Sequence, residues 1–349
     1  MKVEEVRKCS FQNWYKDFRK LTIKSIILPL PEDFVQFLLK DGLFLPKNSG
    51  FENSRPADNN DSGSEDEEET DWDDDDDNSH ESEIPQFLEL DEKIKDAIDT
   101  LDGAVFPKLN WSCPRDSYWI GMNSSLRCTT LSDVYLLLKS SDFIVHDLTE
   151  RFLKCDDFME NESDLKKEPF YLVLRRWTSI ETSCEFRCFV FNKTLIGICQ
   201  REFKTYYEHF NKEKNDIVKD IMVFFQRHIQ PKFTCDNYIF DVYRKAQNKV
   251  YLIDFNPFGE VTDALLFNWD ELNSGSVKIN DDNLPEFRYV EKDSKITNAP
   301  LLQYAFPLDY HDLCSGEDSF KFVDFLKGLK CYNEGQGQPE DDSDEEWKV

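Results

Sequence analysis

The chain has 349 residues, of which 40% are hydrophobic and 29 are Phe, and its formal net charge is −28. This composition supplies ample material for a core, and the length favours one two-lobed body. No basic stripe is present that could follow a phosphate backbone, so we expect no nucleic-acid partner. No apolar run is long enough to span a membrane, and the first residues lack the apolar centre of a signal peptide. We therefore expect a cytoplasmic protein that binds no membrane.

Most of the negative charge lies in two segments. Residues 58–83 hold 15 acids and no Lys or Arg, and the last sixteen residues hold seven acids and one Lys. Subtracting −15 and −6 from −28 leaves −7 for the remainder, an ordinary value for a globular surface. Segments of such composition cannot offset the entropy lost on ordering, so we expect disorder in them. A solvated linker and a binding segment anchored by Trp72 are both compatible with the first of them.

These shifts in composition predict the domain organisation. An N-terminal helix and strand at 1–45 pack on a body at 85–333, with a disordered acidic insert at 46–84 and an acidic tail at 334–349. The ten Cys are scattered without a CxxC motif, so we expect buried thiols rather than a zinc or redox site.

Hydrophobic periodicity predicts the elements in chain order. An aromatic stripe at i, i+3, i+4 and i+7 indicates a helix at 11–18 that faces a core. The further predicted elements are a strand at 22–30, helices at 32–39 and about 94–101, a strand at 105–106, a helix at 134–138 and a short capped element after 140, a strand at 169–180, a hairpin about Asn192 and Lys193, a helix over 217–228, strands at 238–244 and 250–255, a helix at 265–272, a polar loop through 298 and a helix at 315–329.

The strands 238–244 and 250–255 form a predicted hairpin around a polar turn. Alternation places Asp241 on a face with apolar neighbours, and it places Leu252, Asp254 and Asn256 together on one face of the second strand. Two carboxylates and an amide oxygen on adjacent strands are ligands of the kind that Mg²⁺ takes. Two exposed strand-end acids are the alternative. The apolar neighbours favour a metal site, because polar atoms among them rarely lack a partner.

Two further segments carry candidate ligand-binding residues. Lys108 follows a strand and is close in sequence to Asn110, Ser112, Arg115 and Asp116, an arrangement that can bind phosphate, although single strand-end lysines are usually solvated. The strand at 169–180 carries Arg175, Arg176 and Trp177 near its end. In the hairpin about Asn192, the side chains of Glu185, Arg187 and Phe189 share a face, where charges pair across strands or point at a ligand.

Several long strings resemble the cell division cycle protein 123 family. They are YLIDFNPFGEVTD, FDVYR before it and VFPKLNWSCPRDSYWI upstream, and the resemblance runs from TIKSIILPLP to SGEDSFKFVDFLK. It implies an α+β, ATP-grasp-like fold of two lobes with ATP and Mg²⁺ between them. In that setting Lys108 contacts phosphate, and Asp241, Asp254 and Asn256 hold Mg²⁺. The other implied cofactor-binding residues are Asn110, Trp111, Ser112, Arg115, Asp116, Arg175, Arg176 and Trp177 near the base, and Glu185 and Arg187 in the cleft.

The resemblance also implies a function. The expected protein is an MgATP-binding assembly chaperone that binds the γ subunit of eukaryotic translation initiation factor 2 and promotes its joining to the α subunit, in support of translation initiation and cell-cycle progression. We expect a monomer before the client binds. An ATP-grasp ligase or phosphotransferase is the alternative, with Arg244 or Arg201 near the γ-phosphate, and a scaffold that needs no nucleotide is a third. The sequence leaves catalytic turnover open, and it contains no P-loop or kinase motif.

Overall fold

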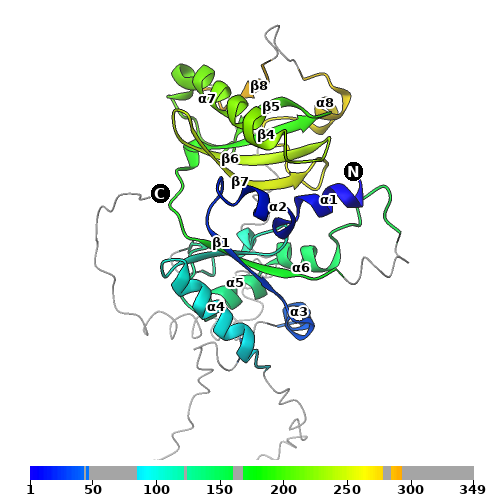
Figure 1. Ribbon diagram of the computed structural model, residues 1–349, viewed down its shortest axis with the longest axis vertical. Helices are drawn as coiled ribbons and strands as arrows, with labels where there is room; N and C mark the ends of the chain where they lie inside the picture. The colour runs from blue at the N-terminus through cyan, green and yellow to red at the C-terminus, as the bar shows by residue number, and fades with distance from the viewer. Residues whose placement is uncertain (43–44, 47–84, 122–123, 160–167, 278–283, 293–349) are drawn as a thin grey trace, which may run out of the picture. The chain divides into compact units, whose positions relative to one another are not determined.

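The computed structural model describes residues 1–42, 45–46, 85–121, 124–159, 168–277 and 284–292. Two β-sheets and the helices packed against them make up this part of the chain (Figure 1). Nearly all of the predicted acidic insert, the predicted helix at 315–329 and the acidic tail lie outside the described residues. In the described residues, no helix is both long and apolar enough to cross a membrane.

The smaller sheet has three antiparallel strands in the order β1-β3-β2, with β1 at Ser25–Pro29, β3 at Tyr171–Arg176 and β2 at Val105–Lys108. Its central strand is buried over the apolar residues Leu172, Val173 and Leu174, which are fully covered, and also over Arg175. All three strands lie where sequence periodicity predicts them. The register sets Lys108 opposite Val173 and Phe106 opposite Arg175, so both cationic side chains belong to this sheet.

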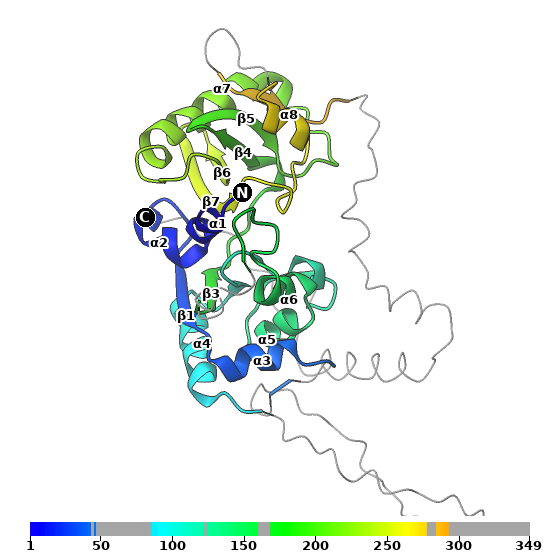
Figure 2. The same cartoon turned by 90° about the vertical axis from the view of Figure 1, so that its right-hand side faces the viewer.

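Four helices gather at the smaller sheet (Figures 1 and 2). They are α3 at Glu32–Leu39, α4 at Leu88–Thr100, α5 at Leu131–Lys139 and α6 at Asp142–Thr149. Thr130 and Ser141 cap the starts of α5 and α6 by accepting backbone hydrogen bonds. Lys139 at the end of α5 donates to the Phe37 carbonyl at the end of α3 (2.7 Å), which satisfies a helix-terminal acceptor.

The larger sheet has five strands in the order β7-β6-β4-β5-β8. Four are antiparallel neighbours, β4 at Glu185–Phe191, β5 at Thr194–Gln200, β6 at Tyr238–Ala246 and β7 at Lys249–Pro257. The fifth strand, β8 at Glu286–Arg288, pairs in parallel with β5. The sequence pattern had predicted a polar loop at these residues, and this was wrong. A strand of three residues is too short for its side chains to show a clear alternation.

Helices cover both faces of the larger sheet. On one face, α7 at Phe210–Phe224 and the π-helical turn η5 at Phe225–Ile229 pack on Phe240 and Val242 in the main core. On the other face, α8 at Trp269–Ser274 joins the apolar cluster that includes Phe189. The helix predicted at 265–272 was wrong in its start, because Asn268 caps α8 and Leu265 has a positive φ of 55°.

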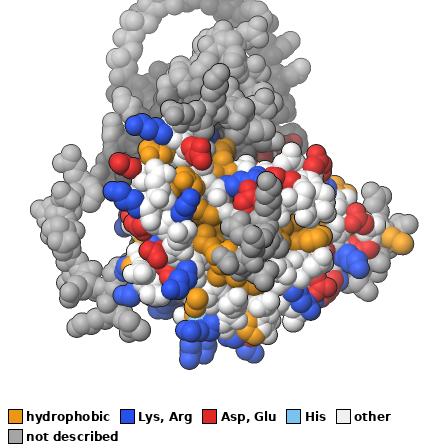
Figure 3. Space-filling view, turned by 90° about the horizontal axis from the view of Figure 1, so that it is seen from above, with side chains coloured by type: hydrophobic (Ala, Val, Ile, Leu, Met, Phe, Trp, Pro, Cys, Tyr) orange, Lys and Arg blue, Asp and Glu red, His pale blue; other side chains and the backbone are white. Residues whose placement is uncertain are grey.

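The N-terminal segment contacts both sheets. Helix α1 at Val3–Cys9 leads into α2 at Phe11–Phe18. The predicted aromatic stripe of α2 is confirmed, with Phe11, Trp14 and Phe18 buried and Tyr15 half-buried. Beyond α2, the Leu21 carbonyl accepts a hydrogen bond from the Leu252 amide of β7 (2.8 Å), and Thr22 forms a parallel bridge there. The chain then enters β1 of the smaller sheet. On the face shown in Figure 3, basic and acidic side chains are interspersed around apolar ones.

Candidate functional site

The hairpin of β6 and β7 carries the two predicted metal-binding acids in register. Asp241 lies opposite Asp254 and Ile239 lies opposite Asn256. A bulge follows, because Val242 lies opposite Leu252 and leaves the intervening residue of β7 unpaired. The extra residue reverses the alternation, so Leu252 packs in the main core with Val242. The prediction that Leu252 shares the face of Asp254 and Asn256 was therefore wrong.

Asp241 is held by two arginines. The Arg187 Nε and Nη2 atoms donate to Asp241 Oδ1 and Oδ2, both at 2.8 Å, and the Arg201 Nε atom lies 3.5 Å from Oδ2. Burial alone would raise the pKa of Asp241, but the two arginines outweigh it and hold this pKa below its ordinary value. Asp241 is therefore a carboxylate at neutral pH, and a third donor, the Asn256 amide nitrogen, lies 3.3 Å from Oδ2.

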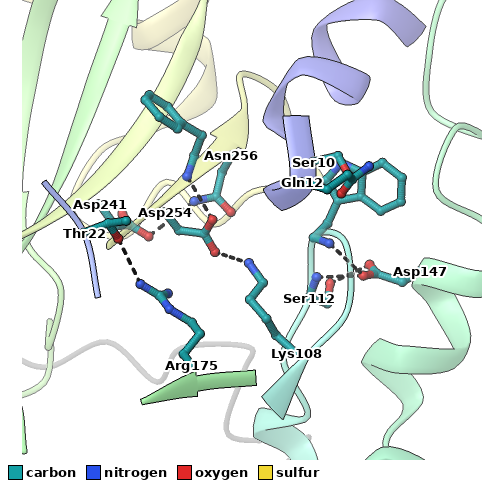
Figure 4. Close-up of polar contacts among 12 residues, drawn as sticks. Ser10, Gln12, Thr22, Lys108, Ser112, Asp147, Arg175, Asp241, Asp254 and Asn256 are labelled. Atoms are coloured by element: carbon teal, nitrogen blue, oxygen red, sulfur yellow. Dashed lines mark hydrogen bonds and ion pairs between the residues drawn. The ribbon is translucent and has the colours of Figure 1, made fainter. Parts of the chain in front are cut away.

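Asp254 forms an ion pair with Lys108 of the smaller sheet (Figure 4). The Lys108 side chain is only 2% exposed, and the Asp254 side chain is 17% exposed. The second Asp254 oxygen accepts a hydrogen bond from the backbone amide of Phe255 at 3.0 Å. The ion pair thus connects β2 of the smaller sheet to β7 of the larger sheet and places the Lys108 side chain beside the strand register that holds Asp241 and Asp254.

Arg175 is a buried cation of the site with one unused hydrogen-bond donor. Its residue is 4% exposed, its Nη2 atom donates to Thr22 Oγ1 at 3.3 Å, and its Nε atom has no hydrogen-bond partner within the described part of the chain. Among the described residues no carboxylate forms an ion pair with it, and burial lowers its pKa. A buried guanidinium with an unused donor is suited to bind an anion.

The loop after Lys108 is fixed by hydrogen bonds to other parts of the chain. Asp147 of α6, which is 3% exposed, accepts hydrogen bonds from the Ser112 amide and hydroxyl, both at 2.7 Å, and from the Trp111 amide at 3.2 Å. The Trp111 indole donates to the Val6 carbonyl (2.8 Å), and Asn110 Oδ1 accepts from the Tyr171 amide (2.8 Å). These contacts hold the backbone beside Lys108 in place, because they join it to α1, to α6 and to the start of β3.

The remaining predicted site residues fall into two groups. Arg115 and Glu185 lie among the charged groups of the site, and burial raises the pKa of Glu185. Asp116 instead accepts hydrogen bonds from the Ser141 hydroxyl (2.5 Å) and from the start of α6. Arg176 pairs with Asp102 at 3.3 Å on the surface, and the Trp177 amide donates to the Ala104 carbonyl at 2.9 Å.

The two arginines considered for a γ-phosphate lie in different places. Arg201 reaches Asp241, as described above. Arg244 instead donates to Asp220 (2.8 Å) and Glu213 (3.0 Å) of α7, which pack on the opposite face of the sheet. Arg201 therefore belongs to the cluster of charged side chains around Asp241, a place that was not predicted for it. The sequence did contain a signal for this. Cys199 lies opposite Arg187 in the register, and Arg201, two positions further along and just past the end of β5, falls on the same face.

The donor set fits a hard divalent cation that completes its coordination with phosphate or water. Two carboxylates in register and one amide lie on the same strands, and oxygen atoms of this kind are ligands for Mg²⁺. Within the described ranges, no group of three or more His, Cys, Asp or Glu could hold a metal. Any ion here would therefore depend on Asp241, Asp254 and Asn256 with ligands from outside the chain. The nearby cations Lys108, Arg175, Arg187 and Arg201 suit a polyphosphate.

The architecture and the site define a mixed α+β protein with cationic and acidic side chains from two sheets converging on one place. The sequence model described as D123 matches residues 14–314, and the chain belongs to the D123 family. The predicted family and the α+β fold class are thereby confirmed.

Similar proteins agree with this membership. The chain is 46% identical over 331 residues to the translation initiation factor eIF2 assembly protein of Xenopus tropicalis, covering 94% of this chain and 97% of that protein. It is 38% identical over 329 residues to the protein of the same name from Schizosaccharomyces pombe, covering 91% and 94%. The solved structure of Cdc123 from Schizosaccharomyces pombe is similar, with a TM-score of 0.67, 35% identity, and coverage of 84% of this chain and 99% of that one.

Proposed function

We propose that this protein is an MgATP-binding assembly chaperone for eukaryotic translation initiation factor 2. It binds the γ subunit and promotes its joining to the α subunit, and it thereby supports translation initiation and cell-cycle progression. We further propose that it acts in the cytoplasm, as a monomer until the client binds. The names of the relatives from Xenopus tropicalis and Schizosaccharomyces pombe support the assembly role.

One observation carries the nucleotide part of the proposal. Arg187, Asp241 and Asp254 form a row across three neighbouring strands, and Lys108 and Arg175 from the other sheet reach the same place. This supports Asp241, Asp254 and Asn256 as the ligands of Mg²⁺, which when bound neutralises phosphate charge. Lys108 and Arg175 bind phosphate oxygens, and Arg187 keeps Asp241 ionised and oriented.

A ligase or phosphotransferase is the second candidate. It is favoured by Arg201, whose Nε atom lies 3.5 Å from Asp241 and whose side chain is 24% exposed, because a partly exposed cation can contact a transferred phosphate. Release of ADP in proportion to a modified acceptor would favour this candidate. Assembly without any acceptor-dependent ADP release would favour the chaperone.

The assembly role is tested by mixing purified γ and α subunits with and without this protein and MgATP. The amount of γ–α complex is measured by size-exclusion chromatography. We expect more complex, and faster formation, only when both the protein and MgATP are present. The Asp241→Asn variant should lose this effect. The Asp236→Asn variant, which removes an exposed carboxylate paired to Lys193 at 3.2 Å, should retain it. Equal assembly without the protein would refute the proposal.

A further inference from the structure

Phe11, the first residue of α2, contacts two cations of the candidate site. Its side chain is fully buried, and its ring centroid lies 5.3 Å from Lys108 Nζ and 5.4 Å from Arg175 Cζ. Both cations belong to the smaller sheet, on β2 and β3, whereas Phe11 lies far upstream in the sequence. The face of an aromatic ring attracts cations at these distances, most strongly where water is excluded.

The position of the Phe11 ring is fixed on several sides. Its backbone amide donates to the Asn110 carbonyl at 2.8 Å, which ties the start of α2 to the loop after Lys108. The Tyr15 ring stacks on it at 5.1 Å between centroids, and the Trp14 ring meets it edge-on at 4.5 Å. The Tyr15 hydroxyl in turn accepts from the Ser25 amide at 2.8 Å, at the start of β1. Turning the ring away would therefore break its contacts within α2, and the Tyr15 ring on which it stacks is itself held to β1.

The Phe11 ring gives Arg175 and Lys108 a contact that they share. Lys108 has Asp254 as a partner, but within the described ranges Arg175 has one long hydrogen bond, to Thr22, and a free Nε atom. Two buried cations at one ring repel each other unless something holds both. We propose that Phe11 is a positioning residue of the nucleotide site, whose ring holds Lys108 and Arg175 together so that both can bind phosphate. This inference rests on the proposed function.

The test is a calorimetric titration of ATP, in the presence of Mg²⁺, into the full-length wild type and two Phe→Leu variants. Phe11→Leu removes the ring that touches the cations. Phe34→Leu is the matched control, because Phe34 is equally buried and its ring neighbours are Phe37, Phe87 and Tyr135. We expect the Kd to rise about tenfold in Phe11→Leu and to stay within about twofold in Phe34→Leu. Phe11→Met, which fills irregular space, replaces Phe11→Leu if that variant fails to fold.

A second measurement separates positioning from a general structural effect. Phe11→Leu is repeated in an Arg175→Gln background, where we expect its effect on Kd to shrink by half or more, because one of its two targets is gone. Equal Kd changes in Phe11→Leu and Phe34→Leu, or an undiminished effect in the Arg175→Gln background, would overturn the inference alone. A wild type that binds no MgATP would overturn the proposed function together with the inference.

Discussion

The ion pair between Lys108 and Asp254 makes a strong prediction about stability. Asp254→Ala removes the carboxylate that pairs with a Lys108 that is 2% exposed. Lys108 is then left without its carboxylate partner in a place where water has little access. A remaining neighbour is the Phe11 ring at 5.3 Å, which is a weaker partner than a carboxylate.

The magnitude follows from the burial of the two groups. Removing one partner of a buried pair costs about 3–5 kcal/mol of unfolding free energy. Because the Asp254 side chain is 17% exposed, water can partly take the place of the lost carboxylate beside Lys108, and we expect a loss of about 2–3 kcal/mol. Adding Lys108→Met to Asp254→Ala should recover most of this loss, because an apolar chain of similar length removes the unpaired charge. Asp254→Asn should lose less than Asp254→Ala, because it retains an oxygen acceptor.

The assay is urea unfolding followed by Trp fluorescence and extrapolated linearly to zero denaturant. The control is Glu89→Ala, which removes the exposed partner of Lys93 at 2.6 Å and should leave the unfolding free energy nearly unchanged, because water screens an exposed ion pair. A loss of less than about 0.5 kcal/mol in Asp254→Ala would refute the reasoning. So would a double variant with Lys108→Met that is no more stable than Asp254→Ala alone.

Three further predictions follow from single contacts. Asp147→Ala leaves the Ser112 amide and hydroxyl without their acceptor, so urea unfolding should show a loss of about 2 kcal/mol and calorimetry a weaker affinity for ATP. In Gly197→Ala, the added Cβ would lie 2.7 Å from the Phe267 ring, costing about 1–3 kcal/mol, of which Phe267→Leu should restore a part. Neighbouring arginines hold the pKa of Asp241 below its ordinary 3.8, so its ionisation contributes stability that is lost as pH falls through that lowered pKa. The difference in unfolding free energy between wild type and Asp241→Asn should therefore shrink below pH 3.8; a constant difference would contradict it.

Much of the fold was predictable because its elements have strong local patterns. The stripe of α2, the apolar strand β3 and the turn at Asn192 and Lys193, which both have positive φ (48° and 61°), are visible in the sequence. Strand β8 and the start of α8 were not predictable. The former is a strand only because β5 offers it an edge, and the latter depends on one capping side chain, Asn268. Tertiary pairing and capping decide such short elements more than propensity does.

The candidate site was predictable only in part. Alternation correctly indicated that Asp241 and Asp254 lie side by side, since each strand repeats every two residues. The bulge that turns Leu252 to the other face has no signal in composition or spacing. The contacts of Lys108 with Asp254 and with Phe11 join residues that lie far apart in the sequence. Such contacts depend on how the two sheets meet, which periodicity does not describe.

The central claim is that carboxylates from β6 and β7 and cations from both sheets form one MgATP site. Calorimetric titration of ATP into the full-length protein, with Mg²⁺ and with the metal removed by a chelator, tests it most directly. We expect saturable binding with Mg²⁺, much weaker binding without it, and a clear loss of affinity in Asp254→Asn, which preserves the shape of the side chain. Absence of binding by the wild type, equal wild-type affinity with and without Mg²⁺, or undiminished affinity in Asp254→Asn would contradict it.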